Sequence, residues 1–145
     1  MMITEKQRNL LMMSESIKEE GFYDLYKYLK RNKTVSISEA RRSPLLKNIH
    51  AYIDELITES QLEWEEDPTQ PVKDLGEKFK YISRKCDLCG KKPIRYEHRI
   101  RNTSNAERIV IGSECSKEFG DELQAHLREG LRNSKKASRR LFFGK

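Results

Sequence analysis

The sequence has few of the residues from which cross-linked or membrane-embedded proteins are built. Only 3 of its 145 residues are cysteines, so they cannot all pair in disulfides. No apolar run comes near the roughly 20 residues that span a bilayer, and the opening Met1–Leu11 is too polar for a signal peptide. These absences predict a cytoplasmic, intracellular protein without a membrane partner. Its cysteines are then expected to bind a metal or to be simply buried.

Apolar residues are also scarce for a chain of this length. Hydrophobic residues make up 36% of the chain and charged residues another 36%, which predicts a modest core and a heavily charged surface. We therefore expect no large buried active site. The length fits either a single domain or a helical unit beside a smaller unit that a metal ion stabilises.

Acidic residues are under-represented in the second half of the chain. Residues 72–145 contain 19 Lys and Arg but only 10 Asp and Glu, whereas residues 1–71 contain 10 and 13. The formal net charge of +6 therefore belongs to the half that holds the cysteines. This imbalance indicates either a solvated basic surface or a polyanionic partner. As a partner, nucleic acid (DNA or RNA) fits better than a membrane, because no basic stretch also carries a wide apolar face.

Residues 1–66 are predicted to form a helical region. Apolar side chains recur at helical spacing in three segments, near residues 3–17, 22–30 and 44–57. The acidic run that ends at Asp67, and the prolines after it, interrupt this periodicity. We therefore place a linker at residues 67–77.

A winged-helix arrangement is one interpretation of the helical region, with Leu62–Glu66 as the start of a wing. Its recognition helix would then present Asp54, Glu55 and Glu59, which make a poor surface for phosphates. A structural or protein-binding role is therefore favoured for this region over DNA recognition.

The period of the pattern changes at residue 78, and a zinc-binding module is predicted over 78–131, followed by a basic tail over 132–145. Strands are predicted at 79–83, 94–101 and 108–111. Ser113 is expected to cap a helix that carries apolar residues every four positions. The expected fold class is α+β. An N-terminal helical region is followed by a tight zinc-binding turn (the knuckle), a β-hairpin and a C-terminal helix, in a treble-clef-like order.

Two of the three cysteines are separated by two residues, in Cys86-x-x-Cys89. Thiolates at this spacing can converge on one metal ion, and Gly90 supplies the positive φ that the bend often needs. The same spacing occurs in redox pairs, which sit at the start of a helix. Pro93 follows too soon for such a helix, so the spacing favours a metal site.

Cys115 and His98 are the other candidate ligands. Cys115 lies at the expected start of the last helix, where the helix dipole favours a thiolate. His98 falls on the inward, apolar face of its strand by the period-two pattern. The predicted ligands of one structural Zn²⁺ are Cys86, Cys89, His98 and Cys115. The alternatives for His98 are Glu118, His126 and His50.

The chain resembles a small zinc module of bacterial and phage proteins, whose order is similar to treble-clef zinc fingers. The motifs that carry the resemblance are Cys86-x-x-Cys89-Gly90, Ile94-Arg95-Tyr96-x-His98 and Ile111-Gly112-x-x-Cys115. The resemblance covers about residues 79–130. It implies a treble-clef-like fold and a bound zinc ion, and a protein encoded by a phage or mobile element is one interpretation of it. It implies no substrate, because such modules serve many roles.

We predict that the protein is not an enzyme. A zinc ion with four protein ligands has no open position for water or substrate. Zinc-finger nucleases of the His-Asn-His type have a similar layout, but they need a general-base histidine. No second histidine lies near His98 in the sequence.

Basic residues gather around the predicted knuckle and hairpin. The candidate nucleic-acid-binding residues are Arg84, Lys85, Lys91, Lys92, Arg95, Arg99 and Arg101. The three arginines of the strand would share its outward face by parity, while Tyr96 would face inward. Because few aromatic residues interleave with these cations, binding is expected to be mainly electrostatic and to weaken steeply with salt.

Two functions therefore remain open. The first is a non-enzymatic zinc-binding protein that binds nucleic acid, or regulates, through its basic C-terminal half. The second is a protein-protein interaction module that binds and modulates a host protein. Such a module would use the acidic N-terminal helices or the apolar terminus at Phe142-Phe143.

Overall fold

The structure is a computed structural model that describes residues 3–19, 22–49, 52–69 and 71–142. The chain divides into two compact units, Met1–Glu63 and Trp64–Lys145. Helices and an antiparallel sheet are both present, which confirms the predicted α+β class. Of the helices in the described part of the chain, none combines the length and the apolar character that crossing a bilayer requires.

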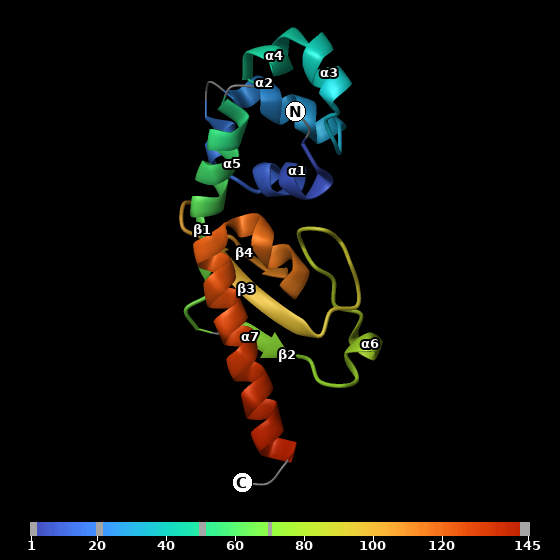
Figure 1. Cartoon of the computed structure of the whole chain (residues 1–145), viewed down its shortest axis with the longest axis vertical. Helices are drawn as coiled ribbons and strands as arrows, with labels where there is room; N and C mark the ends of the chain where they lie inside the picture. The colour runs from blue at the N-terminus through green and yellow to red at the C-terminus, as the bar shows by residue number, and fades with distance from the viewer. Residues whose placement is uncertain (1–2, 20–21, 50–51, 70, 143–145) are drawn as a thin grey trace. The chain divides into compact units, whose positions relative to one another are not determined.

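The first unit is helical, as predicted (Figure 1). Its elements are α1 (Glu5–Met12), the 3-10 helix η1 (Ser16–Lys18), α2 (Tyr23–Arg31), α3 (Ile37–Arg42), α4 (Pro44–Ile49) and α5 (Ile53–Leu62). Thr4 caps α1 in a capping box with Gln7, and Ser36 caps α3. The single helix predicted near 44–57 is two helices, because an unbroken apolar stripe does not reveal where one helix ends and the next begins.

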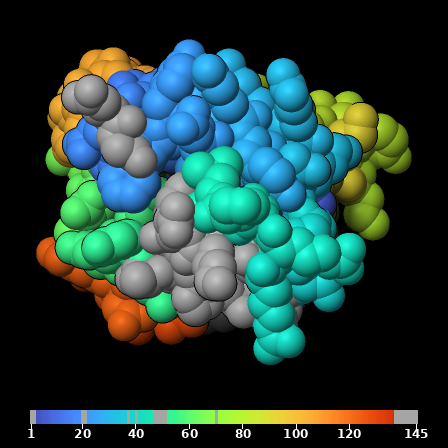
Figure 2. Space-filling view, turned by 90° about the horizontal axis from the view of Figure 1, so that it is seen from above, coloured from blue at the N-terminus to red at the C-terminus, as the bar shows by residue number. Residues whose placement is uncertain are grey.

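One apolar core holds the first unit together. Its buried members are Ile3, Leu11, Ile17, Leu25, Leu29, Val35, Leu46, Ile53 and Leu56. Ile3 and Val35 also exchange two backbone hydrogen bonds of 2.9 and 3.0 Å. In Figure 2 the light-blue atoms of the α2 region lie against the cyan atoms of the α3 region, and the Tyr28 hydroxyl donates to Glu39 at 2.8 Å between them.

The second unit is built around one central strand. Its elements are β1 (Trp64–Glu66), β2 (Val72–Asp74), α6 (Phe79–Ile82), β3 (Tyr96–Asn102), β4 (Arg108–Ile111), the 3-10 helix η4 (Ser113–Phe119) and α7 (Asp121–Phe142). β1 and β2 pair with successive parts of β3 along one edge, and β4 pairs with the other edge; all three pairings are antiparallel. The predicted hairpin of β3 and β4 is therefore confirmed, within a larger sheet.

Residues 67–77 are not a linker, because β2 lies within them. Val72 pairs with His98, and the Asp67 N–H donates to the Arg99 carbonyl at 2.9 Å. The expected start of a wing, Leu62–Glu66, instead contains β1, which pairs with β3 of the second unit. Both strands are three residues long, so they are too short for an alternating pattern to show in the sequence.

Two further predictions about the second unit are wrong. Residues 79–83 do not form a strand, because Phe79–Ile82 is the short helix α6. The helix expected from Ser113 is divided into η4 and α7. Gly120 lies between them with φ 93° and ψ 161°, a conformation outside any helix that glycine adopts without steric cost.

Helix α7 packs against β1, β2 and η4 (Figure 1). Leu123 and Leu127 are its buried residues nearest to η4. Gly130 allows a close approach to the sheet, because a β-carbon at this position would lie 2.9 Å from Cγ2 of Val72. Trp64 of β1 meets Phe119 of η4 edge to face, with ring centroids 5.9 Å apart.

Candidate metal centre

The first two cysteines lie on a tight turn that β4 holds in place. The Gly90 N–H donates to the Cys86 carbonyl at 2.9 Å, and Gly90 has a φ of 77°, as the sequence predicted. Asp87 fixes the turn against β4, since its backbone N–H donates to the Val110 carbonyl and its carboxylate accepts from the Val110 N–H, both at 2.8 Å. The turn therefore depends on the hairpin for its position.

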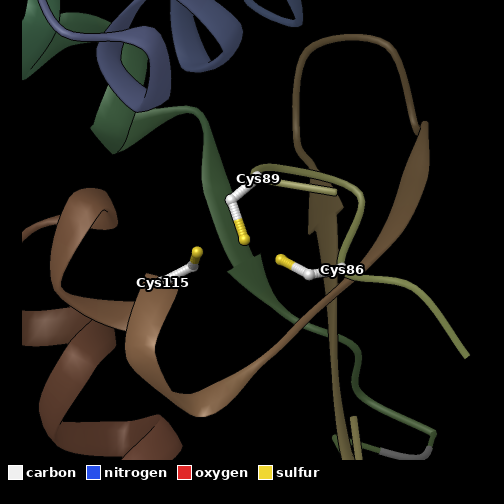
Figure 3. Close-up of side chains that lie close together, drawn as sticks. All are labelled: Cys86, Cys89 and Cys115. Carbon is white, nitrogen blue, oxygen red and sulfur yellow. The ribbon is translucent and has the colours of Figure 1, made fainter. Parts of the chain in front are cut away.

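Cys115 joins these two cysteines from η4. Its backbone N–H donates to the Gly112 carbonyl at 3.2 Å, which places it in the first turn after β4. Figure 3 shows the three side chains directed toward one another, and no two of their sulfurs are more than 4.8 Å apart. Cys86 and Cys115 are buried and Cys89 is half-buried. The structure thus brings together three of the four predicted ligands.

The three sulfurs suit a metal ion in both spacing and protonation. A tetrahedral ion with bonds of about 2.3 Å to sulfur would hold its sulfurs about 3.8 Å apart, so a small contraction of the group closes the site. The Cys115 thiol donates to the Cys86 sulfur, and backbone N–H groups that include that of Cys89 also point at it. These contacts outweigh burial and lower the pKa of Cys86 to about 5. The thiolate is the form that binds a metal.

The pKa of Cys115 is raised well above its ordinary value, because its proton is shared with the Cys86 thiolate and the group is buried. A bound cation would replace this proton and reverse the shift. The triad can therefore hold a metal ion, and its affinity is expected to rise with pH.

His98 is buried, as strand parity predicted, but the structure does not place it in the thiol group. Its Nε2 lies 2.8 Å from the Ser113 hydroxyl, two residues before Cys115. Its Nδ1 is buried and has no hydrogen-bond partner among the described residues. Burial lowers the pKa of His98 to about 4, so the imidazole is neutral near pH 7. Its role as a ligand remains a prediction.

The alternatives to His98 do not join the triad either. Among the described residues, the three cysteines lie together, and neither Glu118 nor His126 belongs to this group. His126 is exposed on α7, and His50 lies outside the described residues.

A cavity of about 230 Å³ adjoins the triad. The cysteines line it together with Lys91, Tyr96 and Glu114, among other residues. Lys91 and Glu114 form an exposed ion pair of 3.3 Å at its wall. No sequence pattern predicts this cavity, because its walls come from four separate segments: α6, the turn at Cys86 and Cys89, β3 and η4.

The basic residues of the strand β3 and its flanks are largely paired with acidic residues. Arg95 makes two hydrogen bonds to Asp74 of β2, at 2.9 and 3.2 Å, and Arg101 is bonded to Glu65 of β1. Arg84 and Arg99 both contact the buried carboxylate of Glu97, at 3.0 and 3.2 Å. Lys85 and Lys92 are exposed and make no salt bridge within the described part of the chain.

Because of these ion pairs, the basic face of β3 is less exposed than the sequence predicts. Glu97, which the alternation of β3 puts on the same face as the arginines, is only 4% exposed. The side chains of Arg95, Arg99 and Arg101 are only 30–34% exposed. Tyr96 is half-buried, with Arg95 and Lys135 over its ring. The sequence does not predict the acidic partners on β1 and β2, because its pattern indicates a wing and a linker where these strands lie.

Comparison with known proteins adds no further constraint on the site. No protein-family model, curated protein or solved structure matches the chain.

Proposed function

We propose that the protein is a non-enzymatic zinc-binding protein whose second unit binds nucleic acid. The observation that carries the metal half of this proposal is the convergence of three cysteine sulfurs from two separate segments, within 4.8 Å of one another. Clusters of thiolates select zinc among the common divalent ions, and mixed cysteine and histidine sites are its usual environment.

His98 is the fourth ligand in this proposal. Its Nδ1 is a buried polar atom without a partner among the described residues, and such an atom is costly unless a proton donor, an acceptor or a metal satisfies it. Ser113, which His98 contacts, is two residues from Cys115, so the imidazole already lies near the chain segment that carries the third thiol.

The proposed role of the ion is structural. It would tie the knuckle at Cys86 and Cys89 to η4 at Cys115, two segments that the whole hairpin separates in the sequence. Zinc contributes roughly 10–16 kcal/mol to the folding of small zinc-finger peptides. The strands are only three to seven residues long, so a link between these two segments would add to the stability of the second unit.

Charge distribution supports nucleic acid as the partner. Residues 64–145 contain 19 Lys and Arg against 13 Asp and Glu, whereas residues 1–63 contain 10 of each. No acidic residue follows Glu129, and α7 continues to Phe142. Arg132 and Lys136 are exposed on this part of α7. The unneutralised charge therefore lies on α7 and on lysines near α6 more than on the paired arginines of β3.

Metal content and binding by the full-length chain test the two halves of the proposal separately. Elemental analysis of the purified protein should find one zinc per chain, and none with Cys89→Ser. Binding of labelled single-stranded and duplex DNA and RNA should be measured by fluorescence anisotropy. With about four phosphate contacts, affinity for a single strand should fall roughly 50-fold when salt rises fourfold.

Charge reversal tests which surface of the protein binds nucleic acid. Arg132→Glu with Lys136→Glu should weaken binding much more than Arg31→Glu with Lys33→Glu, which changes the charge of the first unit by the same amount. Absence of binding to every nucleic acid at low salt would overturn the nucleic-acid half and leave the protein-interaction alternative. It would leave the zinc site untouched.

A further inference from the structure

Helix α6 exposes large side chains that the rest of the second unit does not cover. Tyr81 is 88% exposed and Ile82 is 53% exposed. In Figure 1, α6 projects from the side of this unit opposite α7. Tyr81 makes no ring contact within the described residues. By contrast, cationic side chains cover the rings of Tyr26 and Tyr96.

The backbone on both sides of Tyr81 is fixed. Phe79 is half-buried and lines the cavity beside the cysteines. Ser83 ends the helix with a φ of 53°, and its N–H donates to the Phe79 carbonyl at 3.3 Å. The Arg84 carbonyl then accepts from the Ile94 N–H at 3.0 Å, and the Arg84 side chain binds the buried Glu97. The exposed ring is therefore held on an anchored turn.

Cations surround this turn without acidic residues among them. Residues 78–86 contain four basic residues and no acidic one: Lys78, Lys80, Arg84 and Lys85. The three lysines are exposed and form no salt bridge within the described part of the chain. The segment thus combines a bare aromatic ring with three lysines that make no salt bridge within the described residues.

We propose that α6 and its flanking lysines form a contact for single-stranded nucleic acid, in which Tyr81 stacks on an unpaired base. This inference rests on the proposed nucleic-acid function and names the form of nucleic acid that the protein recognises. Single strands expose base faces, on which aromatic rings stack, while lysines neutralise the neighbouring phosphates. In a duplex the base faces are covered by their neighbours and only the edges are open in the grooves.

A protein partner fits the same surface less well. Lysine is depleted at the centres of protein interfaces, where contiguous apolar and aromatic residues dominate. Tyr81 and Ile82 are instead flanked by charged residues on both sides in the sequence. The positive charge matches a phosphate backbone.

Substitution of Tyr81 in the full-length protein tests the stacking. Tyr81→Ala should weaken binding of a labelled single-stranded oligonucleotide by about 5-fold to 100-fold, the range that loss of one base–aromatic stack produces. Tyr81→Phe should retain affinity. Ile82→Ala removes an exposed apolar side chain of the same turn without a π-face, so it should change affinity less than Tyr81→Ala. Duplex binding should change little in all three variants.

A fluorescent ring gives a second measurement. The native Trp64 is 5% exposed, so a Tyr81→Trp variant adds a reporter on the surface. Single-stranded oligonucleotide should quench its emission, as base stacking requires. The matched control is Tyr52→Trp, on a residue of the first unit that is 56% exposed, whose emission should not respond.

The outcomes separate this inference from the function on which it rests. If the wild-type chain binds no nucleic acid, the proposed function fails. If the chain binds nucleic acid but Tyr81→Ala binds single strands as tightly as wild type, or the Tyr81→Trp emission is unchanged at saturation, the inference is overturned and the proposed function stands.

Discussion

At the scale of single residues, His98 is the side chain on which the composition of the metal site depends. It is buried on β3. One of its ring nitrogens contacts Ser113, and the other has no hydrogen-bond partner among the described residues. A histidine that only fills the core would normally have both nitrogens satisfied or one exposed to water. The orphaned nitrogen is therefore the structural reason to test ligation.

If His98 is the fourth ligand, as proposed, His98→Ala should reduce zinc affinity more than the 10-fold to 100-fold that loss of an outer-shell partner causes, because it removes a coordinating atom. Competition with a chromophoric chelator measures this affinity on the folded protein. His126→Ala, on the exposed face of α7, is the matched control and should leave it unchanged. Equal affinities for wild type and His98→Ala would remove His98 from the ligand set.

Glu63 is a second residue whose importance only the structure revealed. The residue is 7% exposed, and its carboxylate accepts hydrogen bonds from the Ser14 hydroxyl, the Glu15 N–H at 2.7 Å and the Ser16 hydroxyl at 2.8 Å. Burial raises the pKa of Glu63, but these hydrogen bonds outweigh it, so its pKa is lowered overall. The charged carboxylate thus closes the turn between α1 and η1.

Glu63→Gln should cost the first unit about 2 kcal/mol in free energy of unfolding at neutral pH, because a charged acceptor is replaced by a neutral one. With the folded pKa below the unfolded one, this stabilisation is complete above the ordinary pKa of glutamate and is lost as pH falls through the folded pKa. Urea unfolding followed by circular dichroism should therefore show the wild-type advantage shrinking in acid. An advantage that stays constant with pH would contradict it.

At the scale of elements, the contact between α7 and β2 depends on a glycine. A β-carbon at Gly130 would meet Val72 Cγ2 at 2.9 Å, and a β-branched side chain has little freedom to move away. Helix propensity alone would favour alanine at this position by about 1 kcal/mol. The steric contact opposes that gain.

Gly130→Ala should therefore destabilise the second unit in the wild-type background and stabilise it by about 0.5–1 kcal/mol once Val72 is alanine. A double-mutant cycle by chemical unfolding, followed through Trp64, measures the coupling between the two positions. Equal effects of Gly130→Ala in both backgrounds would contradict the close contact between α7 and β2 at these two positions.

The elements that sequence patterns predicted were those with local signals. The strand at 108–111 and the tight turn at Cys86–Cys89 could be predicted because alternation, spacing and glycine placement lie within a few residues. Helix α6 could not be predicted, because Phe79-Lys80-Tyr81 alternates between apolar and polar residues as a strand would. Only the absence of a pairing partner distinguishes this single helical turn from a strand. The salt bridges of β3 and its flank could not be predicted either, because Asp74 and Glu65 belong to strands that are too short to recognise in the sequence.

At the scale of the whole molecule, the proposed metal and the two-unit division predict unequal stability of the two units. A strong chelator should unfold the second unit while the helical signal of the first unit persists, because the proposed zinc ligands all lie in residues 64–145. Trp64 emission should shift to the red as its 5% exposed ring becomes hydrated. Far-ultraviolet circular dichroism should retain a helical component. One cooperative loss of both signals would contradict the prediction.

The position of the boundary between the units determines where a truncated protein should begin. α5 ends at Leu62 and β1 begins at Trp64, so Glu63 alone joins them, and it is itself buried and hydrogen-bonded. Proteases cut exposed, unpaired chain, and Glu63 is neither exposed nor unpaired. A truncated protein that begins at residue 78 would lack β1 and β2 and leave one edge of β3 bare, a template for aggregation. Expression of the second unit by itself should therefore start at Trp64.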